Sequence, residues 1–270
     1  MTISQALFLG VIQGATEFLP VSSSGHLILA EHLLGLPDTP IVFDVTLHLG
    51  TLVAVLAYFR RDWVAMARSL SGSAEARATR RLAAMLIVGT IPGAFGGWML
   101  SHYAETAFRS PWLVTATLAG VALLFLLAER FAGHMRAFPS IGFKDALVIG
   151  VSQALAIVPG VSRSGITMSA ALFMGLERQA AARFSFLLSA PIIAGSGLYE
   201  GLKMLRRPWT GGLSGLDFVW GFIAAAVSGY LVIAFLMRYL VKHTFYPFIY
   251  YRLALALLVA VVLITTNIGG

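Results

Sequence analysis

The segment from Gln13 to His26, QGATEFLPVSSSGH, brings together side chains that can do acid–base and nucleophilic chemistry. It places a carboxylate at Glu17, three consecutive hydroxyls at residues 22–24, a glycine and a histidine within fourteen residues. The sequence around the segment is almost continuously apolar. Ionisable groups in such surroundings are costly unless they have a partner or a function. We therefore expect the functional site here.

Glu17 is the main chemical candidate in the segment. An ionised carboxylate in an apolar helix needs a cation, a metal or a proton. The alternative is a protonated carboxyl with a purely structural role. Gln13, one turn earlier, can orient a ligand or water but cannot act as a base. His26 suits general acid or base chemistry near neutral pH, although an isolated histidine is more often a core residue.

The serines and glycine after Pro20 fall where the backbone must turn. Successive N–H groups at such a turn, with a helix beginning near Gly25, form a concavity that binds anions. The alternative is an ordinary helix cap, since serine is a preferred N-cap residue. On the anion interpretation, Ser22, Ser24 and Gly25 bind the anionic substrate together with Ser23.

A second segment, PGVSRSG at residues 159–165, repeats the first with one informative change. Shifting the sequence by 140 residues aligns residues 6–25 with residues 146–165, with nine identities in twenty positions. Arg163 occupies the position of Ser23, between Ser162 and Ser164 and before Gly165. A guanidinium in a broken intramembrane helix implies an anion such as phosphate. The alternative is a structural ion pair with Glu17.

The elements that carry these segments are predicted to be membrane helices. The chain has 270 residues, of which 58% are hydrophobic and only 11% charged, against about 25% charged residues in soluble domains. Six spans are predicted at roughly 41–59, 82–101, 112–128, 184–202, 217–237 and 247–266. The pairs 3–19 with 26–35, and 143–158 with 165–175, are too short and broken for spans, so we expect two re-entrant hairpins.

The predicted fold is thus an all-α polytopic membrane protein forming one domain, residues 1–270. The duplicated halves, approximately 1–135 and 140–270, each contain a hairpin and three spans. An odd number of spans inverts the second half relative to the first, and paired helix breaks in inverted repeats point to the binding site. Each hairpin then enters from its own side, and their tips meet near the middle.

Charge sets the expected orientation. One side of the membrane collects fourteen basic residues, Arg252 among them, against four on the other side, which are Arg109, Lys203, Arg206 and Arg207. Both termini are then external, or periplasmic in a Gram-negative cell. The net charge of +7 is attributed to cytoplasmic loops that meet anionic lipid headgroups, rather than to a nucleic-acid-binding surface.

Cysteine is absent, so a metal would need oxygen or histidine ligands. The N-terminus lacks the basic region and cleavage site of a signal peptide, so we expect it to be retained.

Three motifs resemble those of the undecaprenyl-diphosphate phosphatase family of the bacitracin-resistance type. They are the Gln13–His26 segment, PGVSRSG, and FDVTLHLG at residues 43–50; the resemblance extends over the whole chain. It implies an inner-membrane hydrolase that converts undecaprenyl diphosphate to undecaprenyl phosphate and inorganic phosphate. Such an enzyme uses a divalent cation, Mg²⁺ or Ca²⁺. It recycles the lipid carrier for peptidoglycan synthesis and confers tolerance to bacitracin.

The resemblance also implies roles for individual residues. Glu17 corresponds to the metal ligand or general base, Ser23 to the proposed nucleophile and His26 to its activator or the acid. Arg163 corresponds to the diphosphate clamp. Gln13 stands where many members have Glu, which puts a two-carboxylate metal site in doubt. Attack by serine, histidine or water stays open.

The same features also fit other classes of membrane protein. Inverted repeats with broken helices are also typical of transporters, so a carrier or flippase for a phosphorylated lipid or anion is the alternative. A lipid phosphatase of the phosphatidic-acid type is rejected, because no His or Asp follows Arg163 at the required spacing. Asp44 and His48 are expected to be supporting groups at most, and a homodimer is left open.

Overall fold

The computed structural model describes residues 1–33, 35, 39–69, 76–105, 110–206 and 212–266, and no β-strand occurs among them. Six described helices are long and apolar enough to cross a membrane. The prediction of an all-α polytopic membrane protein is therefore confirmed. The six are α3 (Ile41–Tyr58), α5 (Arg77–Glu105), α6 (Pro111–Phe131), α9 (Arg178–Arg206), α10 (Gly215–Tyr239) and α11 (Tyr246–Thr266).

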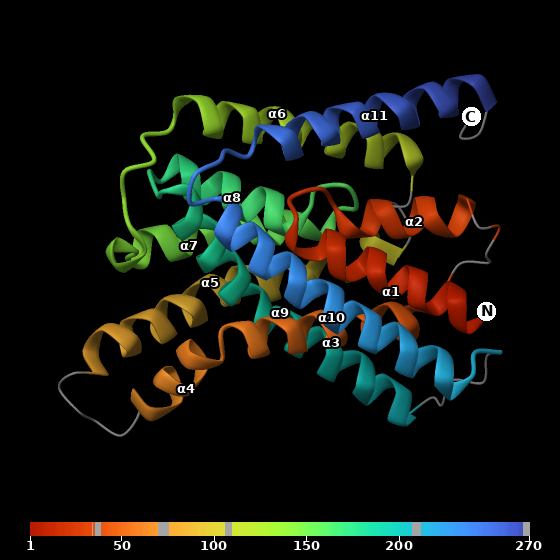
Figure 1. Cartoon of the computed structure of the whole chain (residues 1–270), viewed down its shortest axis with the longest axis horizontal. Coiled ribbons are helices and arrows are strands. Elements are labelled where there is room, and N and C mark those ends of the chain that lie inside the picture. The colour runs from red at the N-terminus through yellow and green to blue at the C-terminus, as the bar shows by residue number, and fades with distance from the viewer. Residues whose placement is uncertain (34, 36–38, 70–75, 106–109, 207–211, 267–270) are drawn as a thin grey trace.

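Two pairs of short helices carry the sequence motifs. The first is α1 (Ile3–Phe18) with α2 (Ser23–Leu33), and the second is α7 (Phe143–Ala154) with α8 (Arg163–Phe173), where a 3-10 turn, η4 (Leu155–Ile157), extends α7. In Figure 1, α1 enters from the end that holds both termini, whereas α7 and α8 lie toward the opposite end. Re-entrant placement in a bilayer and the inverted repeat itself stay predictions.

Glycine allows each short pair to pack closely on a long helix. α1 packs along α10 and the corresponding α7 packs along α5. A Cβ added at Gly10 of α1 would lie 2.8 Å from the Ala224 Cβ, and one at Gly150 of α7 would lie 2.7 Å from the Gly89 Cα. Only glycine permits such close approach of two helices. The turns that follow α1 and α7 are thereby held at a fixed depth in the protein.

The end opposite the termini carries most of the basic residues. The amphipathic helix α4 (Arg60–Ser69) lies there (Figure 1), as does η3 (Phe138–Ser140). Arg136 forks onto Asp145 at the start of α7, with N–O distances of 2.8 and 2.7 Å. Burial alone would raise the pKa of Asp145, but hydrogen bonds from Arg136 and the Gly142 amide lower that pKa overall. The ion pair holds the base of the second hairpin.

Arg252 is a correction to the charge count. We counted it with the basic residues at one side of the membrane, near the start of the predicted span 247–266, but it is completely buried within α11. Its side chain turns inward to backbone carbonyls of the core. The fourteen basic residues on that side become thirteen. Arg109 and Arg207, which we counted on the other side, lie outside the described residues.

Candidate active site

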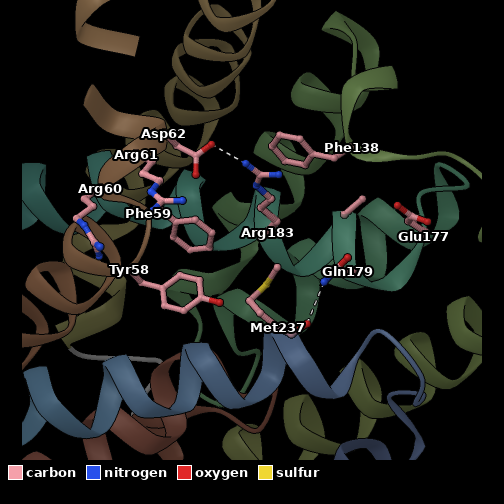
Figure 2. Close-up of a pocket in the computed structure, with 11 residues that line it drawn as sticks. Tyr58, Phe59, Arg60, Arg61, Asp62, Phe138, Glu177, Gln179, Arg183 and Met237 are labelled. Atoms are coloured by element: carbon pink, nitrogen blue, oxygen red, sulfur yellow. Dashed lines mark hydrogen bonds and ion pairs between the residues drawn. The ribbon is translucent and has the colours of Figure 1, made fainter. Parts of the chain in front are cut away.

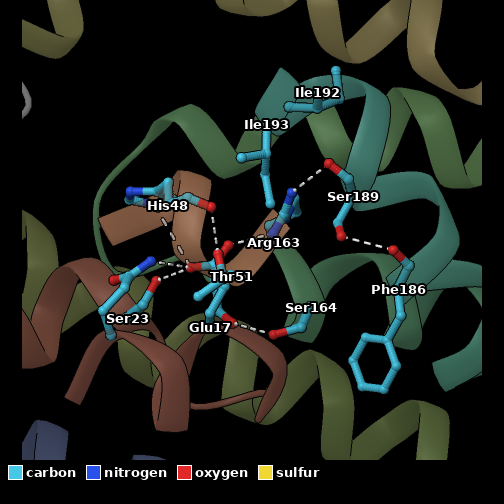
Figure 3. Close-up of polar contacts among 12 residues, drawn as sticks. Glu17, Ser23, His48, Thr51, Arg163, Ser164, Phe186, Ser189, Ile192 and Ile193 are labelled. Atoms are coloured by element: carbon cyan, nitrogen blue, oxygen red, sulfur yellow. Dashed lines mark hydrogen bonds and ion pairs between the residues drawn. The ribbon is translucent and has the colours of Figure 1, made fainter. Parts of the chain in front are cut away.

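The carboxylate of Glu17 is the centre of the polar cluster between the two turns (Figure 3). Glu17 lies in the last turn of α1 and is buried. Its Oε2 accepts hydrogen bonds from Gln13 Nε2 at 3.0 Å and from Ser23 Oγ at 2.7 Å. Its Oε1 accepts from Nη2 of Arg163. Ser23 and Arg163, which the repeat alignment made equivalent, thus meet on one carboxylate.

Arg163 begins α8, and its side chain is largely buried. Besides Glu17, its guanidinium donates from Nη1 to the Ser189 carbonyl of α9 at 3.2 Å. The ion pair that we considered as a structural alternative is therefore formed. It is not sealed, because Glu17 and Arg163 both line a cavity of about 270 Å³. A ligand that enters this cavity meets the guanidinium directly.

The cavity is lined by both polar and apolar side chains. Serine hydroxyls, Gln153 and the ion pair line it together with Ile192, Ile193, Ala156 and Ile157. Figure 3 shows Ile192 and Ile193 of α9 above the guanidinium. Gly93 and Gly97 of α5 complete the wall. An anionic headgroup attached to a hydrocarbon chain matches this mixed lining.

The two turns share an unusual backbone. Ser22 and Ser162 are equivalent in the repeat, and both have positive φ, at 78° and 69°. A left-handed non-glycine residue is uncommon, and such residues gather at functional sites. The turns let α2 begin at Ser23 and α8 at Arg163, so both helix N-termini, which favour anions, lie at the cluster. We expected the first of these helices to begin near Gly25, two residues later.

The other predicted binding residues stabilise or line these turns. Ser162 Oγ caps α8 by accepting from the Gly165 amide at 3.1 Å, and Ser164 Oγ donates to the Leu19 carbonyl at 2.9 Å. Ser24 lines the cavity, whereas Gly25 and Gly165 lie buried in the first turns of their helices. A Cβ at Gly165 would approach Ser162 and Arg252 to 3.2 Å. Through the hydrogen bond from Ser164 to Leu19, the second turn contacts the first directly.

The two histidines differ in placement. The Nδ1 of His26 lies 2.7 Å from the Ser22 carbonyl and its Nε2 lies 2.6 Å from the Tyr251 hydroxyl of α11. His26 is not among the residues that line the cavity, and its acid–base role stays a prediction. His48 of α3 does line the cavity, and its Nε2 lies 3.6 Å from Glu17 Oε2. We undervalued His48, although the FDVTLHLG motif contained the signal.

Arg252 is a second residue whose importance the sequence analysis missed. Its guanidinium donates to the Pro20 carbonyl of the first turn at 3.3 Å. It also donates to the Gly160 and Val161 carbonyls of the second turn, at 2.9 and 3.2 Å, and to Leu118 of α6. One buried cation therefore holds both turns. An arginine followed by the apolar run LALALLVAVV was the available signal.

The donor set can be compared with the expected divalent cation. No group of three His, Cys, Asp or Glu side chains that could hold a metal occurs within the described residues. The Oε1 atom of Gln13, however, is buried without a hydrogen-bond partner, close to the only carboxylate of the cluster. Mg²⁺ in phosphoryl-transfer sites is held by one or two side-chain oxygens together with substrate phosphates. The residues present fit a cation that is shared with a diphosphate.

The sequence is similar to known proteins over nearly its whole length. The family model described as bacitracin resistance protein BacA matches residues 6–258. The undecaprenyl-diphosphatase of Rubrobacter xylanophilus is 48% identical, over 98% of this chain and 99% of the relative. That of Desulforudis audaxviator is also 48% identical, over 96% and 97% of the two chains, and that of Pelotomaculum thermopropionicum is 43% identical over the whole of both. The resemblance predicted from the motifs is confirmed, and the chain belongs to the BacA family of bacitracin resistance proteins.

Proposed function

We propose that this chain hydrolyses undecaprenyl diphosphate to undecaprenyl phosphate and inorganic phosphate. The observation that supports this most directly is the cavity that Glu17, Ser23 and Arg163 line together with apolar residues such as Ile192 and Ile193. The relatives named undecaprenyl-diphosphatase, at 42% to 48% identity, support the same substrate. A carrier would need a binding site but no carboxylate bonded to a hydroxyl, so the transporter alternative is not favoured.

Arg163 binds the diphosphate in this proposal. A guanidinium presents several donors in a plane and forks onto phosphate oxygens. The bound substrate competes with Glu17 for these donors and weakens the resting ion pair. The amides at the starts of α2 and α8 add donors around the same phosphate. These fixed donors stabilise charge on the phosphoryl group in the transition state.

Glu17 accepts a proton from the attacking oxygen. Ser23 Oγ already donates to Glu17 Oε2 at 2.7 Å, the geometry required for that transfer. If Ser23 attacks, the bond between the terminal phosphorus and the bridging oxygen breaks, undecaprenyl phosphate leaves, and water then releases phosphate from the serine. If water attacks, Glu17 takes the proton of water instead, and inorganic phosphate is formed in one step.

A divalent cation, Mg²⁺ or Ca²⁺, belongs to the same proposal. When bound, it would neutralise the diphosphate charge and favour departure of the leaving group. Glu17 and the Gln13 carbonyl oxygen are the side-chain ligands that would hold it. The second carboxylate that the family resemblance implies at the position of Gln13 is not required for this shared coordination.

Phosphate release from undecaprenyl diphosphate by the purified protein in detergent tests the function. We expect turnover with Mg²⁺ or Ca²⁺, its loss after chelation, and a fall of about 100-fold or more in Arg163→Ala, because a charge-stabilising donor is removed. Arg130→Ala, which removes an exposed arginine of α6, is the matched control and should retain activity. Turnover of Arg163→Ala close to that of the control would contradict the assigned role.

The orientation is part of the proposal. The bias of thirteen basic residues against four supports an orientation with the α4 end in the cytoplasm and both termini and the cavity toward the periplasm or exterior. The residues of α5 and α9 that line the cavity lie in the halves nearer the termini. Because the chain has no cysteine, Gly212→Cys and Gly133→Cys can be labelled selectively in cells. Only Gly212→Cys should react with an impermeant maleimide, and the reverse pattern would invert the orientation.

A further inference from the structure

A second pocket lies at the end of the molecule opposite the termini. It has a volume of about 390 Å³ and lies between the α3–α4 junction, the start of α9 and the end of α10 (Figure 2). Among the described residues, it shares no lining residue with the cavity at Glu17. Nothing in the proposed hydrolysis uses this pocket.

Three arginines, Arg60, Arg61 and Arg183, line the pocket. Arg183 is already neutralised, because its Nη2 donates to Asp62 at 2.6 Å, and its guanidinium stacks 4.3 Å above the Phe138 ring. This pair fixes one wall of the pocket.

The other two arginines are available to a ligand. Arg61 has no hydrogen-bond or ion-pair partner within the described part of the chain. Arg60 makes one long hydrogen bond, from Nη1 to the Ala57 carbonyl at 3.4 Å. Both side chains are exposed. Glu177 also lines the pocket, but in Figure 2 its carboxylate lies at the side away from these two arginines. The side of the pocket near the α3–α4 junction therefore carries two positive charges that no described ion pair neutralises.

The base of the pocket is apolar. Phe59 is buried, and Ala180 and Met237 complete this surface. The Tyr58 ring lies beside them, with its hydroxyl directed into the pocket in Figure 2. The pocket begins where the apolar span α3 gives way to the basic amphipathic helix α4. This is the depth at which a bilayer changes from hydrocarbon to headgroups.

We propose that this pocket binds the phosphate of an anionic phospholipid headgroup, with Arg60 and Arg61 as its ligands. Guanidinium groups bind phosphate by paired, charge-assisted hydrogen bonds, and basic pockets between membrane helices bind lipid headgroups. The apolar base accommodates the glycerol and the first acyl carbons, which a free phosphate lacks. The bound lipid fixes α4 against α9 and α10.

Native mass spectrometry of the full-length protein, released from an uncharged detergent, tests this site. Phosphatidylglycerol, diacylglycerol and inorganic phosphate are titrated separately. We expect one phosphatidylglycerol per chain, bound about tenfold more weakly by the double variant Arg60→Gln with Arg61→Gln, because two charge-assisted contacts are removed. Diacylglycerol should not bind at this site, and millimolar phosphate should displace little lipid.

The matched control is Arg130→Gln with Lys144→Gln. It removes two exposed positive charges at the same end of the molecule but outside the pocket. Its affinity for phosphatidylglycerol should equal that of the unmodified protein. The proposal would be overturned if both double variants lost affinity for phosphatidylglycerol equally, or if neither lost it. It would also be overturned if diacylglycerol bound as tightly as phosphatidylglycerol. Complete displacement of the lipid by inorganic phosphate would contradict a phospholipid ligand and indicate a site for free phosphate instead. Because the readout is lipid binding, these outcomes do not depend on the phosphatase assay.

Discussion

Glu17 and Arg163 form an ion pair across the junction of the two helical turns, although 146 residues separate them in the sequence. Each group compensates the other in an interior where a single charge would be costly. The same pair lines the cavity, so the interaction that stabilises the resting protein involves the groups assigned to the reaction. Stability and activity should therefore respond differently to changes in the pair.

The first prediction separates these two effects. Glu17→Gln and Arg163→Met should each lower the free energy of unfolding by about 3–5 kcal/mol, because the remaining partner is left uncompensated. The double variant should be more stable than the sum of the single effects implies. All three variants should lack phosphate release. Thermal melts in detergent and the phosphate assay provide the measurements, and strictly additive melting temperatures would argue against a direct ion pair.

Arg252 is predicted to be a positioning residue. Its side chain makes no hydrogen bond to the side chain of a residue that we assign to the chemistry. It donates hydrogen bonds to backbone carbonyls in both turns. Arg252→Met should reduce kcat by tenfold or more, because Ser23 and Arg163 lose their fixed relative position. Arg252→Lys should recover part of that loss, since one ammonium can bond some of the carbonyls.

The readout for Arg252 must exclude a simple loss of folding. Leu118→Ala removes a buried side chain of α6 next to the same guanidinium and serves as a destabilised control. At equal melting temperature, Arg252→Met should show the larger fall in kcat. Equal kcat in the two variants would reduce Arg252 to a structural residue.

The two histidines give a third prediction. His48 lies 3.6 Å from the Glu17 carboxylate, whereas His26 bonds Tyr251. His48→Gln should therefore alter the dependence of kcat on pH, because it removes an ionisable group beside the proposed base. If His26 acts only through its contact with Tyr251, His26→Gln and Tyr251→Phe should have similar, pH-independent effects. A changed pH profile in His26→Gln alone would instead support the acid–base role that the family resemblance implies for it.

Much of this arrangement could be predicted from the sequence because membrane helices leave strong patterns. Hydropathy located the six long helices, and the internal similarity brought Ser23 and Arg163 to a common centre. His48 and Arg252 were misjudged for a physical reason. Spacing along a helix indicates which face a side chain occupies, but not which neighbour covers that face. The partners of Arg252 are backbone carbonyls. Because every residue has a carbonyl, no pattern of side chains in the sequence indicates which of them the guanidinium will contact.

The apolar wall of the cavity yields the last prediction. Gly97 of α5 lines the cavity, and a Cβ added there would meet no atom within 4 Å. Gly97→Leu should therefore fold normally and place its side chain where the prenyl chain is proposed to lie. We expect kcat/KM for undecaprenyl diphosphate to fall by about tenfold or more, the effect of excluding one or two methylene-sized groups from a pocket. Gly120→Leu on α6 is the matched control, because its Cβ also enters open space but does not line the cavity. Both changes replace glycine within a helix and should raise helix stability alike. Equal kcat/KM in the two variants would move the substrate chain away from α5.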